Sequence, residues 1–475
     1  MAAVSGTRRL VSLQPVLGWR GVGLGAAAAS SAVRPLSTTA ACGGPKGAAH
    51  VRGNKQVQMR KKKKAPPRGK TAEPGERKQL RRRIVLSNGN ALAVTGLEEL
   101  TASRLHDSDS VGRVLALPDG VVDQLRAVGA FKPSQSFSLF RRPSVLIRAE
   151  TATVAAQMQQ AAAARQTLRL VVDGDRIAGK SILLLQALAH GFMNDWVVFH
   201  IPEAHELTSA STDYAPLDPL DGQPPRFVQP AYMLQLLQAV QAASGPVLAR
   251  HKTVRAYDRL QNPVAAGSTL LQLVAAAREN DHAWPVFQAL WSELTTTEPT
   301  EIARPPVLFA LDGLAHVMGY SRYRDPAFEQ VHAHDLALVR AFVDLLAGAE
   351  LLPHGGAVIA ATSRGNAPAC LTLDLALARR LAEQDQTDAA TNTSLTPPPY
   401  FRGFDDRVAA ALHSVRVLRL CGLSRPEARS LMEYWAASGV LRDRVDEQAV
   451  AGTWSLAGNG LVGEMERTAL LSLRP

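Results

Sequence analysis

Short, mostly apolar runs recur through the middle of the chain, and helical patterns separate them. Such runs are typical of strands buried on both faces, as in a parallel sheet flanked by helices. They lie at residues 168–172, 196–201, 307–312, 357–362 and 415–420. Helical apolar spacing marks residues 232–243, 269–279 and 287–295. The pattern predicts an α/β core with a parallel five-stranded sheet.

Weaker patterns on both sides of this core predict its flanking regions. Val121 begins a helical apolar spacing, and residues 157–166 read as an Ala/Gln-rich helix, but no residue type in this part indicates chemistry. After the fifth run, Ser424 and Glu427 form a capping box that opens a helix, which Gly439 ends. The predicted divisions are a mostly helical lead-in at 84–165, the core at 166–385, a polar loop at 386–400, and a C-terminal strand and helical region at 401–475.

Charge is distributed very unevenly along the chain. The net charge is +11, yet residues 1–83 hold 19 Lys/Arg and only two acids. The remainder holds 34 basic and 40 acidic residues, a net charge of −6. The basic character therefore belongs to an N-terminal extension, which is typical of a solvated tail or a nucleic-acid-binding arm.

The first 40 residues have the composition of a mitochondrial transit peptide. They contain four arginines and no acid, and they are rich in Ala, Ser and Gly. The alternative is a secretory signal, whose apolar stretch would be residues 21–33. That stretch is rich in Gly and Ser, so mitochondrial import is favoured, with processing near residues 36–42.

Residues 41–83 predict a disordered basic arm, because almost no apolar residue interrupts the charges. A nuclear localisation signal also fits a run of this kind. Behind a transit peptide, an arm that neutralises an RNA backbone is the favoured interpretation. The RNA-binding candidates are Arg60, Lys61, Lys62, Lys63, Lys64, Arg81, Arg82 and Arg83.

Other features of the composition exclude further classes of protein and kinds of site. No run of eighteen apolar residues appears, so we expect no transmembrane helix and no membrane partner. The three cysteines share no ligand-like spacing, which argues against a disulfide framework and a zinc site.

A complete G-x-x-x-x-G-K-S/T motif joins the first predicted strand to the helix after it. The glycines let the backbone wrap around a phosphate, the lysine supplies a charge, and the serine hydroxyl can ligate Mg²⁺. An ordinary glycine-containing turn is the alternative, but the strand–helix context favours a nucleoside phosphate site. The candidate residues are Gly174, Asp175, Arg176, Ile177, Ala178, Gly179, Lys180 and Ser181.

Two further strand ends carry candidate ligands. Asp312 ends the third run, where a carboxylate can hold Mg²⁺ through water opposite Ser181. Thr362 and Ser363 end the fourth, and the layout resembles the additional-strand ATPase branch of P-loop proteins, in which a polar residue at this place senses the γ-phosphate. A turn-capping role is the alternative for each of these side chains.

The residue after Asp312 argues against efficient hydrolysis. ATPases of this layout place a glutamate there to polarise water, whereas this chain has Gly313. No D-x-x-G follows Asp312, and no N-K-x-D motif is present. We therefore expect a nucleotide to be held with slow or absent hydrolysis, and these residues do not distinguish guanine from adenine.

A set of further motifs in one order resembles the death-associated-protein family. They are the phosphate loop, His200-Ile201-Pro202-Glu203-Ala204, Phe227 with Gln229-Pro230, and Asp312-Gly313. The resemblance runs from about residue 110 to the C-terminus and is strongest to fungal members. It implies a GTP-binding protein of the mitochondrial small ribosomal subunit, with GTP or GDP (ATP is the alternative) and Mg²⁺ at the loop. It also implies contacts with ribosomal RNA and neighbouring subunit proteins.

Two functions follow as alternatives. One is a structural ribosomal protein of the mitochondrial matrix with a mostly static nucleotide. The other is a mitochondrial ATPase or GTPase that turns over nucleotide in ribosome assembly or remodelling. Gly313 and the basic arm favour the first.

Overall fold

The computed structural model describes residues 84–217, 225–298, 302–365, 367–384 and 403–471. These all belong to the second of two compact units, Ala72–Pro475. The predicted transit peptide, the basic arm with its eight RNA-binding candidates, and the 386–400 loop lie outside the described residues, and their assignments stay predictions.

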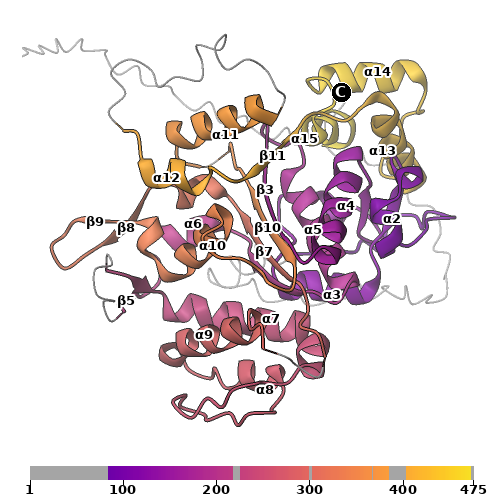
Figure 1. Cartoon of the computed structure of the whole chain (residues 1–475). Coiled ribbons are helices and arrows are strands. Elements are labelled where there is room, and N and C mark those ends of the chain that lie inside the picture. Colours follow the sequence, from indigo (N-terminus) through magenta and orange to yellow (C-terminus); the bar gives the residue numbers. More distant parts are fainter. Residues whose placement is uncertain (1–83, 218–224, 299–301, 366, 385–402, 472–475) are drawn as a thin grey trace, which may run out of the picture. The chain divides into compact units, whose positions relative to one another are not determined.

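Among the described residues, five strands form one parallel sheet, as the sequence predicts. They are β3 (Thr167–Gly174), β4 (Val197–Ile201), β7 (Val307–Asp312), β10 (Gly356–Ala361) and β11 (Arg416–Leu420). Their order across the sheet is β11-β3-β10-β7-β4, and every neighbouring pair is parallel (Figure 1). The mixed α/β class and the five-stranded sheet are confirmed.

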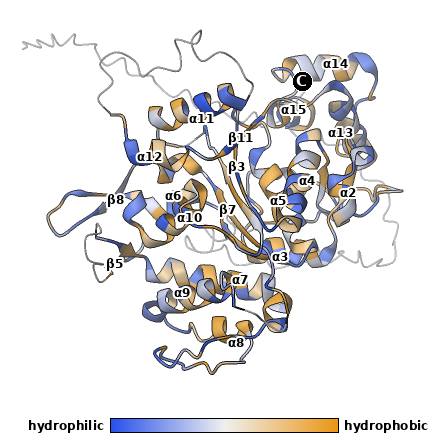
Figure 2. Cartoon of the chain, in the orientation of Figure 1, coloured by the Kyte–Doolittle hydropathy of each residue, from blue (hydrophilic) through white to orange (hydrophobic). Residues whose placement is uncertain are grey.

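Helices cover both faces of this sheet, because successive side chains of each strand point to opposite sides. Val171 belongs to one buried cluster that contains side chains from several helices, whereas Leu170 and Val172 belong to another. Figure 2 shows the apolar strands enclosed between these helices. The first cluster includes side chains of α7 (Pro230–Arg250), α9 (Ala283–Leu294) and α10 (Ala337–Ala347), and the second includes side chains of α4 (Ala149–Ala163) and α5 (Lys180–Met193).

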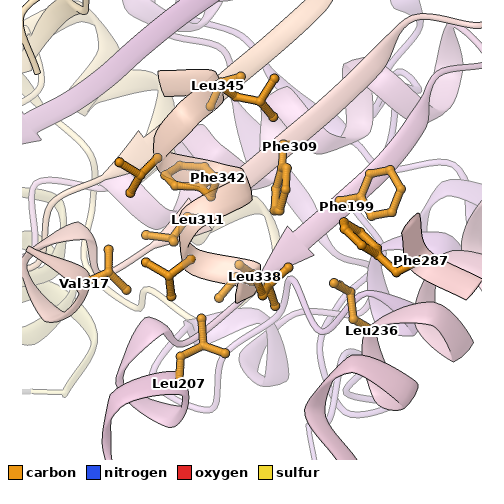
Figure 3. Close-up of a cluster of buried hydrophobic side chains, with 14 of the residues drawn as sticks. Phe199, Leu207, Leu236, Phe287, Phe309, Leu311, Val317, Leu338, Phe342 and Leu345 are labelled. Atoms are coloured by element: carbon orange, nitrogen blue, oxygen red, sulfur yellow. The ribbon is translucent and has the colours of Figure 1, made fainter. Parts of the chain in front are cut away.

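Aromatic rings fill the first of these two cores. Phe199 of β4 and Phe309 of β7 lie with ring centroids 5.7 Å apart, and Phe342 of α10 meets Phe309 edge-on at 5.2 Å (Figure 3). Burying such rings removes large apolar areas from water, which stabilises the layered arrangement.

The lead-in is not purely helical. It contains α2 (Ala102–His106), β1 (Val114–Ala116), α3 (Asp119–Ala127), β2 (Ser144–Leu146) and α4. β1 pairs antiparallel with β2. Three-residue strands are too short to show alternation, so no local pattern predicts this small sheet.

Shorter elements complete the core. The expected helices at 232–243 and 287–295 are parts of α7 and α9, and the one at 269–279 ends at Ala275. None of the described helices is long and apolar enough to cross a lipid bilayer. The remaining elements are α6 (Ala204–Thr208), β5 (Ala215–Pro216), β6 (Phe227–Val228), α8 (Leu270–Ala275), β8 (Tyr320–Arg324), β9 (Gln330–His332), α11 (Leu371–Gln384) and α12 (Asp406–Ala411).

The C-terminal region is helical and packs on the lead-in. The expected capping box opens its first helix, with the Ser424 N–H donating to Glu427 Oε2 at 2.8 Å. Trp435 and Phe140 belong to one buried cluster that joins the two regions. The helices are α13 (Arg425–Ala437), α14 (Glu447–Leu456) and α15 (Val462–Glu466), followed by a π-helical turn at Arg467–Leu471.

Candidate nucleotide-binding site

The glycine–lysine motif forms the loop between β3 and α5. Gly174 has φ of 148° and Gly179 has φ of 103°, a region that side chains strongly disfavour. A Cβ at Gly174 would also lie 2.2 Å from the Leu420 carbonyl oxygen of the neighbouring strand. Both glycines are therefore required by the backbone, and the eight predicted residues lie together at the carboxyl end of β3.

The tip of the loop contacts the C-terminal region. Ile177 has φ of 58°, uncommon for a β-branched residue, and its carbonyl accepts a 3.2 Å hydrogen bond from the Gly463 N–H of α15. A Cβ on Gly463 would lie 2.8 Å from the Cβ of Ile177, so a glycine is needed for this approach. The C-terminal helices and the loop are thus in direct contact.

Lys180 lies inside the loop, where its ammonium group donates to two carbonyl groups of the loop itself. Its Nζ donates to the carbonyl oxygens of Gly174 at 2.8 Å and Asp175 at 2.6 Å. Burial lowers the pKa of Lys180, and the nearby carboxylate of Asp173 opposes that shift. The positive charge therefore lies at the centre of the loop, where a phosphate-binding charge is wanted.

Ser181 and Asp312 meet across the sheet. The Ser181 hydroxyl donates to Asp312 Oδ2 at 2.6 Å, which brings together the two oxygen groups predicted to hold Mg²⁺. The same carboxylate oxygen also pairs with the Nζ of Lys132, which comes from the lead-in. No motif in the sequence indicated that Lys132 would join Ser181 and Asp312.

Asp173, the residue before Gly174, holds the end of the fourth strand. Thr362 Oγ1 donates to Asp173 Oδ1 at 2.7 Å, and the Arg364 guanidinium donates to both oxygens of the same carboxylate. Burial would raise the pKa of Asp173, but these hydrogen bonds outweigh it and the pKa is lowered. Of the two predicted sensor residues, Thr362 is thus engaged with Asp173, and Ser363 adjoins it in the chain.

Arg148 links the loop to the C-terminal strand. Its guanidinium donates to the carbonyl oxygens of Ala178 at 3.1 Å and Cys421 at 3.0 Å. The side chain is buried and also pairs with Glu150 at 3.0 Å. Arg148 precedes α4, in the part of the chain where sequence patterns indicated no chemistry.

A cavity of about 630 Å³ adjoins the loop at Asp175. Its walls come from the lead-in and from the C-terminal region, including Glu150 on one side and Glu427 and Trp454 on the other. Three carboxylate residues line the cavity, namely Glu150, Asp175 and Glu427. No signal in the sequence could have located this cavity, because its two walls are more than 250 residues apart in the chain.

Among the described residues, no group of three or more His, Cys, Asp or Glu side chains is arranged to hold a metal ion by itself. The Ser181–Asp312 pair, which the sequence predicts as metal ligands, brings two oxygen groups together at the loop. Lys132, Arg148 and Asp173 are the members of the site that motif reasoning missed. Only Asp173 stood next to a recognisable motif.

Together, the fold and the site describe an α/β protein with a glycine–lysine loop at the carboxyl edge of a parallel sheet. Comparison with known sequences assigns the family. The profile of mitochondrial ribosomal death-associated protein 3 matches residues 145–468, and the chain belongs to this family. The predicted family is thereby confirmed, and it locates the protein in the mitochondrial ribosome.

Two curated relatives agree with this assignment, and each is named small ribosomal subunit protein mS29. The one from Neurospora crassa is 52% identical over 414 residues, which cover 87% of this chain and 86% of the relative. The one from Schizosaccharomyces pombe is 24% identical over 359 residues, covering 74% and 71%.

Proposed function

We propose that the chain is a structural component of the mitochondrial small ribosomal subunit and holds a guanine nucleotide with Mg²⁺ without appreciable turnover. Membership of the small subunit is supported by the names of both relatives. The observation that carries nucleotide binding is the Lys180 ammonium group inside the glycine loop, with the Ser181–Asp312 pair beside it.

The sheet order supports a P-loop nucleotide-binding core. β10 lies between β3, which leads into the loop, and β7, which ends in Asp312. An extra strand inserted at this place is the arrangement of the additional-strand ATPase branch. The loop also leads directly into α5, so its N–H groups lie at a helix N-terminus, which favours an anion.

Mg²⁺ fits the donor set at the loop. A hydroxyl and a carboxylate oxygen are ligands that Mg²⁺ accepts, usually together with substrate phosphates and several waters. Ser181 would hold the ion directly and Asp312 through water. Bound there, the ion would neutralise phosphate charge, while Lys180 would bind the phosphates and Thr362 or Ser363 would be the candidates for sensing the γ-phosphate.

The cavity beside Asp175 is the proposed place of the base. Its volume of about 630 Å³ is in the usual range for a small-molecule site, and it is continuous with the loop at that residue. Guanine presents two adjacent donors, its N1–H and its N2 amino group, whereas adenine presents an N1 acceptor beside its N6 amino donor. A carboxylate of the cavity wall such as Glu150 can accept from both guanine donors at once, and this is the basis on which we propose guanine.

Slow or absent hydrolysis is supported by the backbone at Gly313. This residue has φ of 92°, and its N–H donates to the Ala361 carbonyl at 2.9 Å, so the position after Asp312 is a tight turn without a side chain. Without a carboxylate there, the site lacks the group that would polarise an attacking water. This favours a structural role over a working ATPase or GTPase.

Contacts with ribosomal RNA are proposed for the basic arm at residues 41–83, and contacts with neighbouring subunit proteins for the folded body. The arm holds 15 Lys/Arg against two acids, enough charge to neutralise several RNA phosphates. The body, with its net charge of −6, has no overall attraction to RNA.

Equilibrium binding tests the nucleotide part of this proposal. GDP, GTP and ATP are titrated separately into purified full-length chain in Mg²⁺ buffer. We expect GDP and GTP to bind more tightly than ATP. Absence of binding by all three nucleotides would contradict the proposal, and a clear preference for ATP would contradict the role given to the cavity.

A further inference from the structure

One cation at the phosphate loop comes from outside the loop motif. Lys132 follows α3 in the lead-in, 180 residues before Asp312 in the chain, and its Nζ pairs with Asp312 Oδ2. The same oxygen accepts the hydrogen bond from the Ser181 hydroxyl. Lys132 thus lies at the pair of oxygen groups where a P-loop protein holds its metal ion.

The segment that carries Lys132 is firmly anchored. Phe131 is buried in the core on the α5 side of the sheet, and its ring meets Phe137 edge-on at 5.2 Å. The Lys132 N–H donates to Gln135 Oε1 at 2.8 Å, which fixes the turn between them. Only 23% of the Lys132 side chain and 6% of the Asp312 side chain are exposed. This is therefore a built contact and not a mobile surface pair.

The charges at this edge of the sheet show what the contact does. Arg364 pairs with Asp173, and Lys132 pairs with Asp312, so both carboxylates already have a cationic partner. Lys180 donates only to neutral carbonyl groups. The carboxylates of Asp173 and Asp312 are therefore each neutralised, which leaves the positive charge of Lys180 for a phosphate at the loop.

We propose that Lys132 is a resident cation of the phosphate site and supplies at Asp312 much of the neutralisation that Mg²⁺ supplies in other phosphate loops. The inference rests on the proposed nucleotide function and adds to it a specific property. A nucleoside diphosphate is retained when Mg²⁺ is removed, because Lys132 already neutralises Asp312 and the charge of Lys180 is left for the phosphates. Such retention suits a nucleotide that serves as a fixed part of a structure.

The test compares GDP affinity in MgCl₂ and in EDTA, using full-length wild-type protein and Lys132→Met. We expect EDTA to weaken wild-type binding by less than about fivefold. For Lys132→Met we expect EDTA to weaken GDP binding at least about tenfold more than it does in the wild type. A charge-assisted contact corresponds to roughly 10–150-fold in affinity. Arg126→Met is the matched control, because it removes an exposed charge of the same lead-in, paired only at 3.6 Å with Asp123. It should behave as wild type.

Two further variants distinguish the effect of the Lys132 charge from the effect of the hydrogen bond by which Lys132 joins the lead-in to Asp312. Lys132→Gln can still donate a hydrogen bond to Asp312 but has no charge, so we expect it to show the same Mg²⁺ dependence as Lys132→Met. Lys132→Arg keeps the charge and should restore retention in EDTA. Lys132→Gln also serves if Lys132→Met does not fold, as judged by its thermal unfolding.

The outcomes are distinct. Equal loss in EDTA for wild type and Lys132→Gln would overturn the proposal, as would wild-type binding that disappears without Mg²⁺. Either result would leave the proposed nucleotide function standing, since GDP would still bind in MgCl₂. Failure of wild-type protein to bind GDP in both buffers would overturn the nucleotide function and this inference together.

Discussion

Ser181 and Asp312 are 131 residues apart in the chain, yet the hydroxyl of one donates a 2.6 Å hydrogen bond to the carboxylate of the other. Parallel pairing explains the contact. β10 lies between the two strands concerned, and Ala361 is in register with both Val172 of β3 and Asp312 of β7. The carboxyl ends of the three strands therefore meet at one edge, where the loop begins.

Replacing Lys180 should weaken nucleotide binding. We expect Lys180→Ala to lose a charge-assisted phosphate contact of roughly 1.5–3 kcal/mol, which is about 10–150-fold in affinity. Isothermal titration with GDP in Mg²⁺ buffer measures the change. Thermal unfolding should remain cooperative, because the ammonium group donates only to two carbonyls of the loop itself and does not join separate elements of the fold.

Arg126→Ala provides the control for this variant, since it removes one exposed positive charge away from the loop. It should bind GDP as the parent does. Parental affinity in Lys180→Ala would show that residues 174–181 are not a phosphate site.

Nucleotide turnover should be negligible. The position that would carry a water-polarising carboxylate is Gly313, in a tight turn with φ of 92°. Phosphate release from GTP and ATP, measured with purified protein, should stay far below the slow end of working enzymes. A kcat on the order of 1 s⁻¹ for either nucleotide would restore the ATPase or GTPase alternative.

Stability should fall as the pH falls from 7 to 5. Burial lowers the pKa of His200 to about 4, from an ordinary value of 6.5. Below pH 6.5 the unfolded chain binds a proton on this histidine, whereas the folded chain excludes that proton down to about pH 4. The stabilising contribution of neutral His200 is therefore complete at pH 7 and is lost as the pH falls through this window. The contribution of this one histidine is on the order of 2 kcal/mol at pH 5, and urea unfolding at each pH measures it.

His200→Asn isolates this effect, because an asparagine can still donate to the Val128 carbonyl that His200 Nδ1 contacts at 3.0 Å, but it does not titrate. Its unfolding free energy should fall less steeply between pH 7 and 5 than that of the parent. The exposed His413→Asn should keep the parental slope. An unchanged slope in His200→Asn would mean that His200 is not the buried neutral group described here.

RNA affinity should depend mainly on residues 41–83. If this arm neutralises several phosphates, log affinity falls with log salt by about 0.7–0.9 per phosphate contacted. Deleting the arm should flatten that slope in co-sedimentation with mitochondrial small subunits, and it should leave nucleotide binding intact. Identical slopes for the full-length and truncated chains would assign the RNA contacts to other residues.

Much of the fold could be predicted from the sequence because the signals were local. The strands of the sheet are mostly apolar runs, although β11 also contains Arg416 and Arg419, and Ser424 with Glu427 marks the start of α13. The β1–β2 pair gave no such signal, since strands of three residues cannot show a period. Pairing between distant short segments is set by tertiary packing, which a local pattern does not record.

The candidate site also contains some residues that a local motif identifies and others that only the packing of distant segments brings to the loop. Residues 174–181 form one contiguous motif, and Asp312 ends an apolar run, so both could be located before the structure. Lys132 and Arg148 could not, because they reach the loop only through the packing of the lead-in against the sheet. The cavity is formed by two regions that are distant in sequence, and no spacing rule links them.

The nucleotide content of assembled small subunits tests the central claim most directly. Small subunits are purified from mitochondria that carry either the wild-type chain or Lys180→Ala, and nucleotides released by acid are quantified by chromatography against the amount of the chain. The account predicts about one guanine nucleotide, GDP or GTP, for each wild-type chain, and its loss from Lys180→Ala subunits. Wild-type subunits that release no nucleotide, or the same amount from both preparations, would contradict it.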